Sequence, residues 1–204
     1  MKTLIINNYL NPNKIKELKD AVKLYSDYKI IEYSDIGSRF TVPYEINAIV
    51  LSGSEARIVK AEHVKMYDGV INLIINTSLP ILGICFGHQL ACLTLGANVG
   101  ALINQVKNFE NVRIIKKDKL FEGFKVEEKI PLAEYHNDYV ERRSLRKSNL
   151  ELLADSFSCE VEAVKHITKP FYGIQFHAER IRMGKEVHRD GLRIIKNFIE
   201  ISRN

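Results

Sequence analysis

The chain has 204 residues, 46% of them apolar and 27% charged, which is enough to bury one hydrophobic core but little for two independent domains. The 11 glycines and 5 prolines follow no period, and this composition excludes disordered, fibrous and low-complexity proteins. Thirty basic and 25 acidic side chains give a formal net charge of +5, but no basic stripe is interleaved with aromatic residues, so we expect no nucleic-acid partner.

The first half of the chain alternates short β-branched runs with longer amphipathic segments. The expected strands are residues 2–7, 29–33, 46–52 and 81–84, and the expected helices are residues 12–28, 59–75 and a segment that ends near Gly96. Strands that alternate with helices are typical of a parallel sheet with crossover helices. The wholly apolar run 81–84 is the pattern of a strand at the centre of such a sheet.

The second half of the chain is rich in strand-like segments joined by short turns. The expected strands are residues 112–116, 129–134, 151–154, 160–166 and 171–176. Residues 184–202 close the chain as a helix whose buried side is expected to include Val187, Leu192, Ile195, Phe198 and Ile199. We therefore expect a single α/β domain over residues 1–204, with a central mixed, mostly parallel sheet flanked by helices.

No segment predicts a membrane span or a secretory signal. Residues 70–86, the longest mostly apolar stretch, are interrupted by polar residues and fall short of roughly 20 apolar residues, and residues 3–6 are too short for the ~7–15-residue core of a signal peptide. We expect a cytoplasmic protein. Three cysteines without CxxC spacing predict reduced thiols and no zinc site, with Cys92 and Cys159 in structural roles.

The sequence G-I-C-F-G at residues 83–87 lies between the apolar strand and the next helix. Such a tight strand-to-helix turn strains the residue at its tip, and the glycines let strand and helix approach closely behind it. Cys85 is thereby presented at a helix N-terminus, where the dipole and free amides favour its thiolate. The amide of Phe86 is placed to hold a developing oxyanion. Cys85 is the candidate nucleophile.

His177 ends a strand of alternating apolar residues, and Glu179 follows two residues later. Alternation places both side chains on one side if the strand continues. An imidazole with a carboxylate near its second nitrogen is the base and orienting group that a thiol nucleophile requires. Because the two motifs lie far apart in the chain, the sequence alone leaves open whether Cys85 and His177 meet.

These residues resemble the class I glutamine amidotransferases, whose glutaminase domains carry G-x-C-x-G-H-Q and, near the C-terminus, Q-F-H-x-E. Here the motifs read G-I-C-F-G-H-Q at residues 83–89 and Q-F-H-A-E at residues 175–179. Residues 51–54, Leu-Ser-Gly-Ser, fall where that family has its oxyanion loop. Within the family, residues 134–140, 159–163 and 165–170 look most like the free-standing glutaminase subunit of archaeal-type GMP synthases.

The resemblance implies the hydrolysis of glutamine to glutamate and ammonia through a γ-glutamyl thioester. Cys85 is expected to attack the carboxamide carbon, His177 to move the thiol proton to the leaving ammonia, and Glu179 to orient the imidazolium. No metal or organic cofactor is expected for this step, and ATP and Mg²⁺ are expected only in a partner synthase.

The resemblance also implies how the substrate is held. The amides of Gly53 and Phe86 are expected to form the oxyanion hole. Gln89 and the backbone at Asn137 and Asp138 match the family positions that hold the α-amino and α-carboxyl groups of glutamine.

Three segments depart from the family pattern. The oxyanion loop usually reads Gly-Gly-Pro, whereas residues 53–55 here are Gly-Ser-Glu, which changes how the loop can flip. Ala178 stands where most members have proline, and residues 7–10, Asn-Asn-Tyr-Leu, replace the Asp-x-Gly-x-Gln-Tyr opening of GMP synthase glutaminases.

Free ammonia becomes ammonium in neutral water, so such a glutaminase needs a separate synthase subunit, expected to be of the ATP-pyrophosphatase type, to receive it. Arg180, Arg182, Lys185 and Arg189 follow the base and are expected to face that partner. Two other functions stay open at this point. One is a non-catalytic glutamine-sensing or scaffold subunit, and the other is a free-standing γ-glutamyl hydrolase.

Overall fold

The computed structural model describes residues 1–37 and 39–203. The strands are β1 (Lys2–Asn7), β2 (Asp27–Glu32), β3 (Ala48–Leu51), β4 (Ile81–Ile84), β5 (Val99–Ile114), β6 (Lys129–Val140), β7 (Leu150–Asp155), β8 (Ala163–His166), β9 (Phe171–Ile174), β10 (Arg182–Met183) and β11 (Glu186–Val187). The α-helices are α1 (Lys16–Lys23), α2 (Ala61–Lys65), α3 (Asp68–Asn76), α4 (Phe86–Thr94) and α5 (Asp190–Ile201). Short 3-10 turns are η1 (Pro12–Ile15), η2 (Tyr33–Asp35), η3 (Lys119–Phe121), η4 (Arg142–Ser144) and η5 (Arg146–Ser148).

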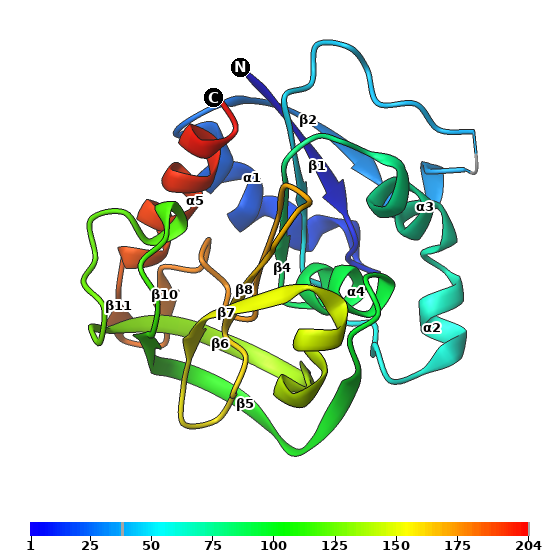
Figure 1. The fold of residues 1–204 in the computed structure, drawn as a ribbon. Helices are drawn as coiled ribbons and strands as arrows, with labels where there is room; N and C mark the ends of the chain where they lie inside the picture. Colours follow the sequence, from blue (N-terminus) through cyan, green and yellow to red (C-terminus); the bar gives the residue numbers. More distant parts are fainter. Residues whose placement is uncertain (38, 204) are drawn as a thin grey trace.

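One mixed sheet organises the molecule (Figure 1). Within the described residues, nine strands pair in the order β2-β1-β3-β4-β9-β8-β7-β5-β6. The pairs from β2 to β9 are parallel and those from β9 to β6 are antiparallel. The expected α/β fold with a mixed central sheet is therefore confirmed, and the parallel part coincides with the half of the sequence that alternates strands and helices.

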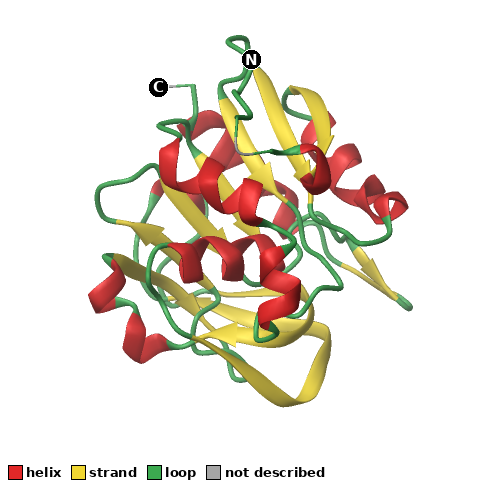
Figure 2. Ribbon diagram, turned by 90° about the vertical axis from the view of Figure 1, so that its right-hand side faces the viewer, coloured by secondary structure: helices red, strands yellow, loops and turns green. Residues whose placement is uncertain are grey.

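Both faces of the parallel strands are covered by helices, as Figures 1 and 2 show. On one face, Ile5 and Val50 belong to a core cluster completed by α1 and α5. On the other face, their neighbours Leu4 and Ile49 pack in a cluster with α3 and α4. Side chains alternate across a strand, so a strand covered on both faces must be apolar at every position. This requirement explains the continuous apolar runs of β3 and β4.

The first helix is shorter than the single helix expected over residues 12–28. It begins as η1 and ends at Lys23, and β2 starts at Asp27 and pairs in parallel with β1. Tyr25, the last residue of the expected apolar pattern, is half-buried against the core on the α1 face although it lies beyond the helix. The expectation was wrong at its C-terminal end because pairing with β1 takes residues 27 and 28 into the sheet.

The helix expected over residues 59–75 is broken into α2 and α3 around Tyr67. Tyr67 is fully buried, stacks on Tyr33 with ring centroids 4.3 Å apart, and donates from its hydroxyl to Asn8 O over 2.6 Å. A Cβ added to Gly69 would lie 1.6 Å from Ile36 O, so only glycine allows this approach. These contacts orient α3 separately from α2.

The structure extends β5 back to Val99 and β6 forward to Val140, far beyond the strands expected at 112–116 and 129–134. The two form a long antiparallel pair with a register shift between Ala101 and Val106. Most side chains in the added part of β5 are exposed or half-buried, so the sequence there has no apolar face to reveal a strand. Cross-strand hydrogen bonding to β6 supplies the stability that the pattern lacks.

The C-terminal helix begins at Asp190, not at Gly184. A small hairpin of β10 and β11 precedes it, with Gly184 at a φ of +60°. Val187, expected on the buried side, lies in this hairpin and is 40% exposed, whereas Ile195, Phe198 and Ile199 are buried as expected and Leu192 is partly buried.

Candidate active site

The turn between β4 and α4 presents Cys85. Its backbone has φ of +49° and ψ of −107°, which non-glycine residues seldom adopt. A Cβ on Gly83 would lie 2.7 Å from Gly87 O, and a Cβ on Gly87 would lie 2.5 Å from Leu51 O. Both glycines are therefore needed for the strand and helix to meet behind the cysteine. The Cys85 side chain is placed at the N-terminus of α4.

His177 follows β9 and is held by its own backbone. Its N–H donates to Ala133 O in β6 over 2.7 Å. The imidazole Nδ1 lies 2.7 Å from Glu179 Oε1, and both residues are buried. The turn that joins them is closed by the N–H of Arg180, which donates to His177 O.

The electrostatics of this group favour a charged histidine. Burial alone would lower the pKa of His177, but the Glu179 carboxylate, Cys85 and hydrogen bonds to both raise it to about 10. Burial raises the pKa of Glu179, but the interaction with His177 lowers it. The pKa of Glu179 is therefore below its usual value. At neutral pH His177 is thus an imidazolium between a carboxylate and the Cys85 sulfur, and an imidazolium stabilises an adjacent thiolate.

Gly53 lies directly against this group. A Cβ added there would be 2.9 Å from His177 Cε1 and 3.0 Å from Tyr9 Oη. The preceding Ser52 is fixed by Asn8, whose N–H donates to Ser52 Oγ and whose side-chain amide donates to Ser52 O, each over 2.8 Å. Phe86, as the first residue of α4, has an N–H without a helical partner. Gly53 thus lies against His177, and the free N–H of Phe86 lies directly after Cys85.

A cleft of about 590 Å³ opens over these residues. Its lining includes Cys85, Phe86, Gln89, Asn137, Asp138 and His177. Gly53 and Glu179 are not part of the lining and lie behind it, against His177. The structure therefore brings together, in the wall of one cleft and directly behind it, the residues that the sequence singled out as candidates for catalysis, the oxyanion hole and substrate binding.

Gln89 and Asp138 are joined by a hydrogen bond beneath the cleft. Gln89 Nε2 donates to Asp138 O over 2.7 Å and to Gln175 Oε1 over 3.0 Å. The Asp138 carboxylate is almost fully buried and accepts hydrogen bonds from Arg57 and from the N–H of Ile58. The Asp138 side chain is therefore taken up by protein groups, and its carbonyl oxygen is taken up by Gln89.

Three residues of the site were missed by the sequence reasoning. Arg57 holds Asp138, and the carbonyl oxygen of Tyr135 lies 3.7 Å from Cys85 Sγ. Tyr9 is buried in the cleft wall, and burial together with Glu179 and Cys85 raises its pKa, so it stays a neutral phenol. Tyr9 stood in the segment that departs from the family opening, Tyr135 stood in the segment 134–140 that resembles the family but was given no role, and Arg57 carried no motif.

The basic residues after His177 do not all point to a partner. Arg180 donates from Nε to Glu17 Oε2 over 2.9 Å and lies over the Tyr135 ring, 5.7 Å from its centroid, so it is engaged within the chain. Arg182 and Lys185 are exposed in the β10–β11 hairpin, and Arg189 is exposed just before α5.

The other two cysteines are buried and free, like Cys85. Burial raises the pKa of both thiols, which keeps Cys92 and Cys159 protonated and unreactive. Cys92 Sγ lies 3.4 Å from Nδ1 of His88, another fully buried group.

Two carboxyl groups are fully buried near the cleft. Glu134 of β6 and Glu162, just before β8, lie close enough to interact electrostatically, and Ser156 Oγ donates to Glu162 over 2.6 Å. Burial and then Glu162 raise the pKa of Glu134 well above its usual value, and burial raises the pKa of Glu162 to about 7. His136 Nε2 lies 3.4 Å from Glu134, which connects the pair to the cleft wall.

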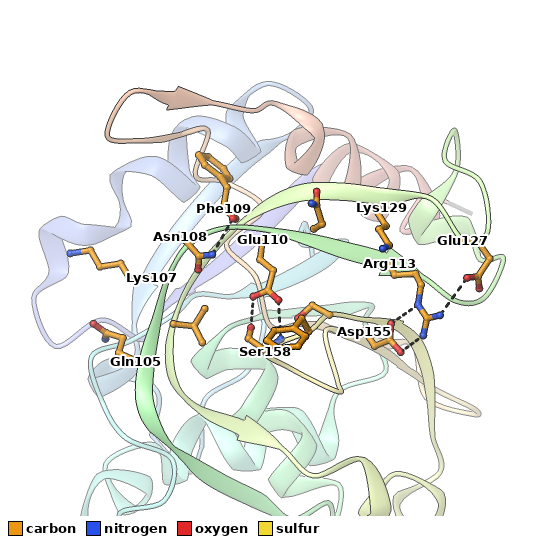
Figure 3. A pocket seen from close by; sticks show the side chains of 14 residues that line it. Gln105, Lys107, Asn108, Phe109, Glu110, Arg113, Glu127, Lys129, Asp155 and Ser158 are labelled. Atoms are coloured by element: carbon orange, nitrogen blue, oxygen red, sulfur yellow. Dashed lines mark hydrogen bonds and ion pairs between the residues drawn. The ribbon is translucent and has the colours of Figure 1, made fainter.

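A larger hollow of about 1120 Å³ runs along the outer part of β5 (Figure 3). It shares Gln105 and Lys107 with the cleft but contains neither Cys85 nor His177. Figure 3 shows Arg113 between Asp155 and Glu127, with which it forms ion pairs.

Among the described residues, no helix is both long enough and apolar enough to cross a membrane. The chain matches the family model "Glutamine amidotransferase class-I" over residues 5–200. A protein of Methanocaldococcus jannaschii, named as one subunit of a glutamine-hydrolyzing GMP synthase, is 37% identical over 158 residues, covering 77% of this chain and 74% of that protein. The protein of the same name from Methanococcus aeolicus is 32% identical over 157 residues, with the same coverage of 77% and 74%.

A solved structure gives the same relationship in three dimensions. The crystal structure of a protein from Thermoplasma acidophilum, described as the corresponding GMP synthase subunit, superimposes with a TM-score of 0.79 at 27% sequence identity, covering 100% of this chain and 94% of that one. The family model spans nearly the whole sequence, including the Cys85 turn and the His177–Glu179 pair. This chain therefore belongs to the class I glutamine amidotransferase family.

Proposed function

We propose that this chain hydrolyses glutamine to glutamate and ammonia through a thioester on Cys85. The observation that carries the proposal is the strained turn that presents Cys85 beside a buried His177, which is itself paired with Glu179 over 2.7 Å. A binding module has no need for a nucleophile, a base and an orienting carboxylate in this arrangement.

The thiolate of Cys85 attacks the carboxamide carbon, and the C–N bond breaks as the His177 imidazolium gives its proton to the leaving ammonia. A water molecule then attacks the thioester carbon and gives a proton to His177, and glutamate leaves as the Cys85–carbon bond breaks. Glu179 keeps the imidazole oriented and stabilises its charged form. These residues and water balance both half-reactions, so we propose that the step needs no metal or organic cofactor.

The amides of Gly53 and Phe86 are proposed as the oxyanion donors, since Gly53 packs against His177 and the Phe86 N–H beside Cys85 has no helical partner. Gln89, Asn137 and Asp138 are proposed to hold the α-amino and α-carboxyl groups of glutamine. In support, all three line the cleft, and the hydrogen bond from Gln89 Nε2 to Asp138 O leaves the Gln89 carbonyl oxygen for the α-ammonium group.

The ammonia is proposed to pass to a separate synthase subunit of the ATP-pyrophosphatase type that makes GMP, with ATP and Mg²⁺ used only by that partner. The two relatives that are 37% and 32% identical are each named as one subunit of GMP synthase, a name that implies a second one. Ammonia released into neutral water is protonated and cannot act as a nucleophile, which gives a physical reason for docking.

The test is glutamate release from glutamine by the purified chain, alone and with a GMP synthase ATP-pyrophosphatase subunit, ATP and xanthylate, beside Cys85→Ala. We expect hydrolysis that rises with the partner and disappears in the variant. No release in either state would favour a glutamine-sensing or scaffold subunit. Rapid release without the partner, with γ-glutamyl amines as better substrates than glutamine, would favour a free-standing γ-glutamyl hydrolase.

A further inference from the structure

The segment that follows Gly53 is attached to three separate parts of the protein. Its contacts are Ser54 Oγ to Tyr67 Oη at 3.0 Å, Glu55 to the Leu10 N–H at 3.0 Å and to Lys14 Nζ at 2.8 Å, and Arg57 to Asp138. This is the loop in which the second glycine and the proline of the family pattern are missing. Side chains of the loop itself therefore hold it in place.

The contact between Arg57 and Asp138 is the strongest of these. Arg57 Nε lies 2.9 Å from both carboxylate oxygens, Nη2 lies 2.5 Å from Oδ1, and the N–H of Ile58 donates to Oδ2 over 3.0 Å. The Asp138 side chain is 3% exposed and that of Arg57 is 32% exposed. A forked, largely buried pair of this kind has a fixed geometry, which a lysine in place of the arginine cannot reproduce.

Asp138 connects this pair to the floor of the cleft. Its carbonyl oxygen accepts the hydrogen bond from Gln89 Nε2 and lies 3.0 Å from His136 Nδ1. The same strand, β6, carries the Tyr135 carbonyl oxygen, which lies 3.7 Å from Cys85 Sγ. One ion pair thus links the loop of Gly53 to the strand beneath the nucleophile.

We propose that Arg57 is a positioning residue for glutamine hydrolysis: through its fork on Asp138 it keeps the loop of Gly53 against His177 and in register with the strand beneath Cys85. Arg57 acts through Asp138 and does not itself take part in bond making. This inference rests on the proposed glutaminase function and adds a residue to it.

The test compares Arg57→Met, Asp138→Asn, the double variant and Arg57→Lys with the wild-type chain in the presence of the synthase subunit, ATP and xanthylate. We expect Arg57→Met to lower kcat about 10- to 100-fold, because a displaced oxyanion donor weakens transition-state stabilisation, with KM nearly unchanged. Arg57→Lys should recover only a small part of the loss. The double variant should be no worse than Arg57→Met, because the two residues act as one unit.

Two controls separate positioning from general damage. Arg113→Met breaks a similar forked pair, Arg113–Asp155 at 2.8 and 2.9 Å, in the outer hollow, and should lower the Tm but leave kcat unchanged (Figure 3). Alkylation of Cys85 by iodoacetamide involves no oxyanion, so its rate in Arg57→Met should stay close to that of the wild-type chain.

The proposal would be overturned if Arg57→Met had the kcat of the wild-type chain and differed only in a lower Tm. It would also be overturned if the rate of Cys85 alkylation in Arg57→Met fell by the same factor as kcat. If Arg57→Met fails to fold, Arg57→Lys and Asp138→Asn decide the matter by the same readouts. A wild-type chain that releases no glutamate would overturn the proposed function and this inference together, whereas an active wild type with an unaffected Arg57→Met overturns the inference alone.

Discussion

Gly53 occupies a position where any side chain would disturb the proposed site. A Cβ there would lie 2.9 Å from His177 Cε1 and 3.0 Å from Tyr9 Oη. We expect Gly53→Ala to lower kcat by about 10- to 1000-fold, because the added methyl group displaces an oxyanion donor. The Tm should change little.

Gly37→Ala is the matched control, because a Cβ at Gly37 would meet nothing within 4 Å. Steady-state kinetics and thermal unfolding of both variants check the prediction. A Gly53→Ala enzyme as active as Gly37→Ala would show that the loop tolerates a side chain beside His177.

The pair of His177 and Glu179 predicts a pH dependence of stability. Burial lowers the pKa of His177, but Glu179 and Cys85 outweigh it and raise the pKa from its ordinary value of 6.5 to about 10. A group whose pKa is raised by folding stabilises the protein fully below its unfolded pKa and loses this contribution as pH rises through the folded pKa.

We therefore expect the free energy of unfolding to fall, by roughly 3–5 kcal/mol, between about pH 6.5 and pH 10. In Glu179→Gln the fall should be smaller and complete at lower pH. Urea unfolding at several pH values measures the free energy of unfolding of both proteins. The same pH dependence in wild type and Glu179→Gln would contradict the raised pKa of His177.

Between elements, the buried carboxyl pair joins β6 to the start of β8. Burial raises the pKa of Glu162 from 4.5 to about 7, opposed by the hydrogen bond from Ser156. For a carboxyl group whose pKa is raised by folding, the unfolded chain ionises first, so stability falls with pH between the unfolded and the folded value.

Glu162→Gln should therefore raise the Tm relative to wild type at pH 8 more than at pH 4.5, by an amount equivalent to roughly 1–3 kcal/mol. Thermal unfolding of both proteins at the two pH values checks this. A difference that is the same at pH 4.5 and pH 8 would mean that Glu162 does not titrate in this window.

For the molecule as a whole, the proposed partner must cover the cleft, and the chain carries a formal net charge of +5. Arg182 is exposed in β10, shortly after His177 in the chain, whereas Arg180 is occupied by Glu17. We expect Arg182→Glu to weaken binding of the synthase subunit several-fold at low salt and less at high salt, because rim charges act over a Debye length of about 10 Å.

Arg146→Glu, an exposed basic position in η5, serves as the charge-matched control and should bind normally. Binding is measured by titrating the chain with the synthase partner in low and in high salt. If Arg182→Glu and Arg146→Glu weakened binding equally, the effect would come from the net charge of the chain. If Arg182→Glu had no effect on binding, the partner would dock elsewhere on the surface.

Much of the fold was predictable because its central strands are buried on both faces. Strand β4 matches its expected bounds, 81–84, and β1 matches 2–7. Only the last residues of β5 were predicted from the sequence. The earlier part of β5 is exposed or half-buried and is held by pairing with β6, a distant segment of the chain. The break at Tyr67 was equally hidden, since it depends on contacts with Asn8 and Tyr33.

Local sequence was sufficient to define the chemistry of this protein: a cysteine between two glycines after an apolar strand predicts a nucleophile turn, and a histidine two residues before a glutamate predicts a base with its orienting group. Such patterns act through bonds and sterics between near neighbours. It took the folded chain to bring Cys85 to His177, to press Tyr9 on Gly53 and to pair Arg57 with Asp138. Arg57 and Asp138 are 81 positions apart, and a contact over that separation exists only because the sheet brings their two segments to one cleft.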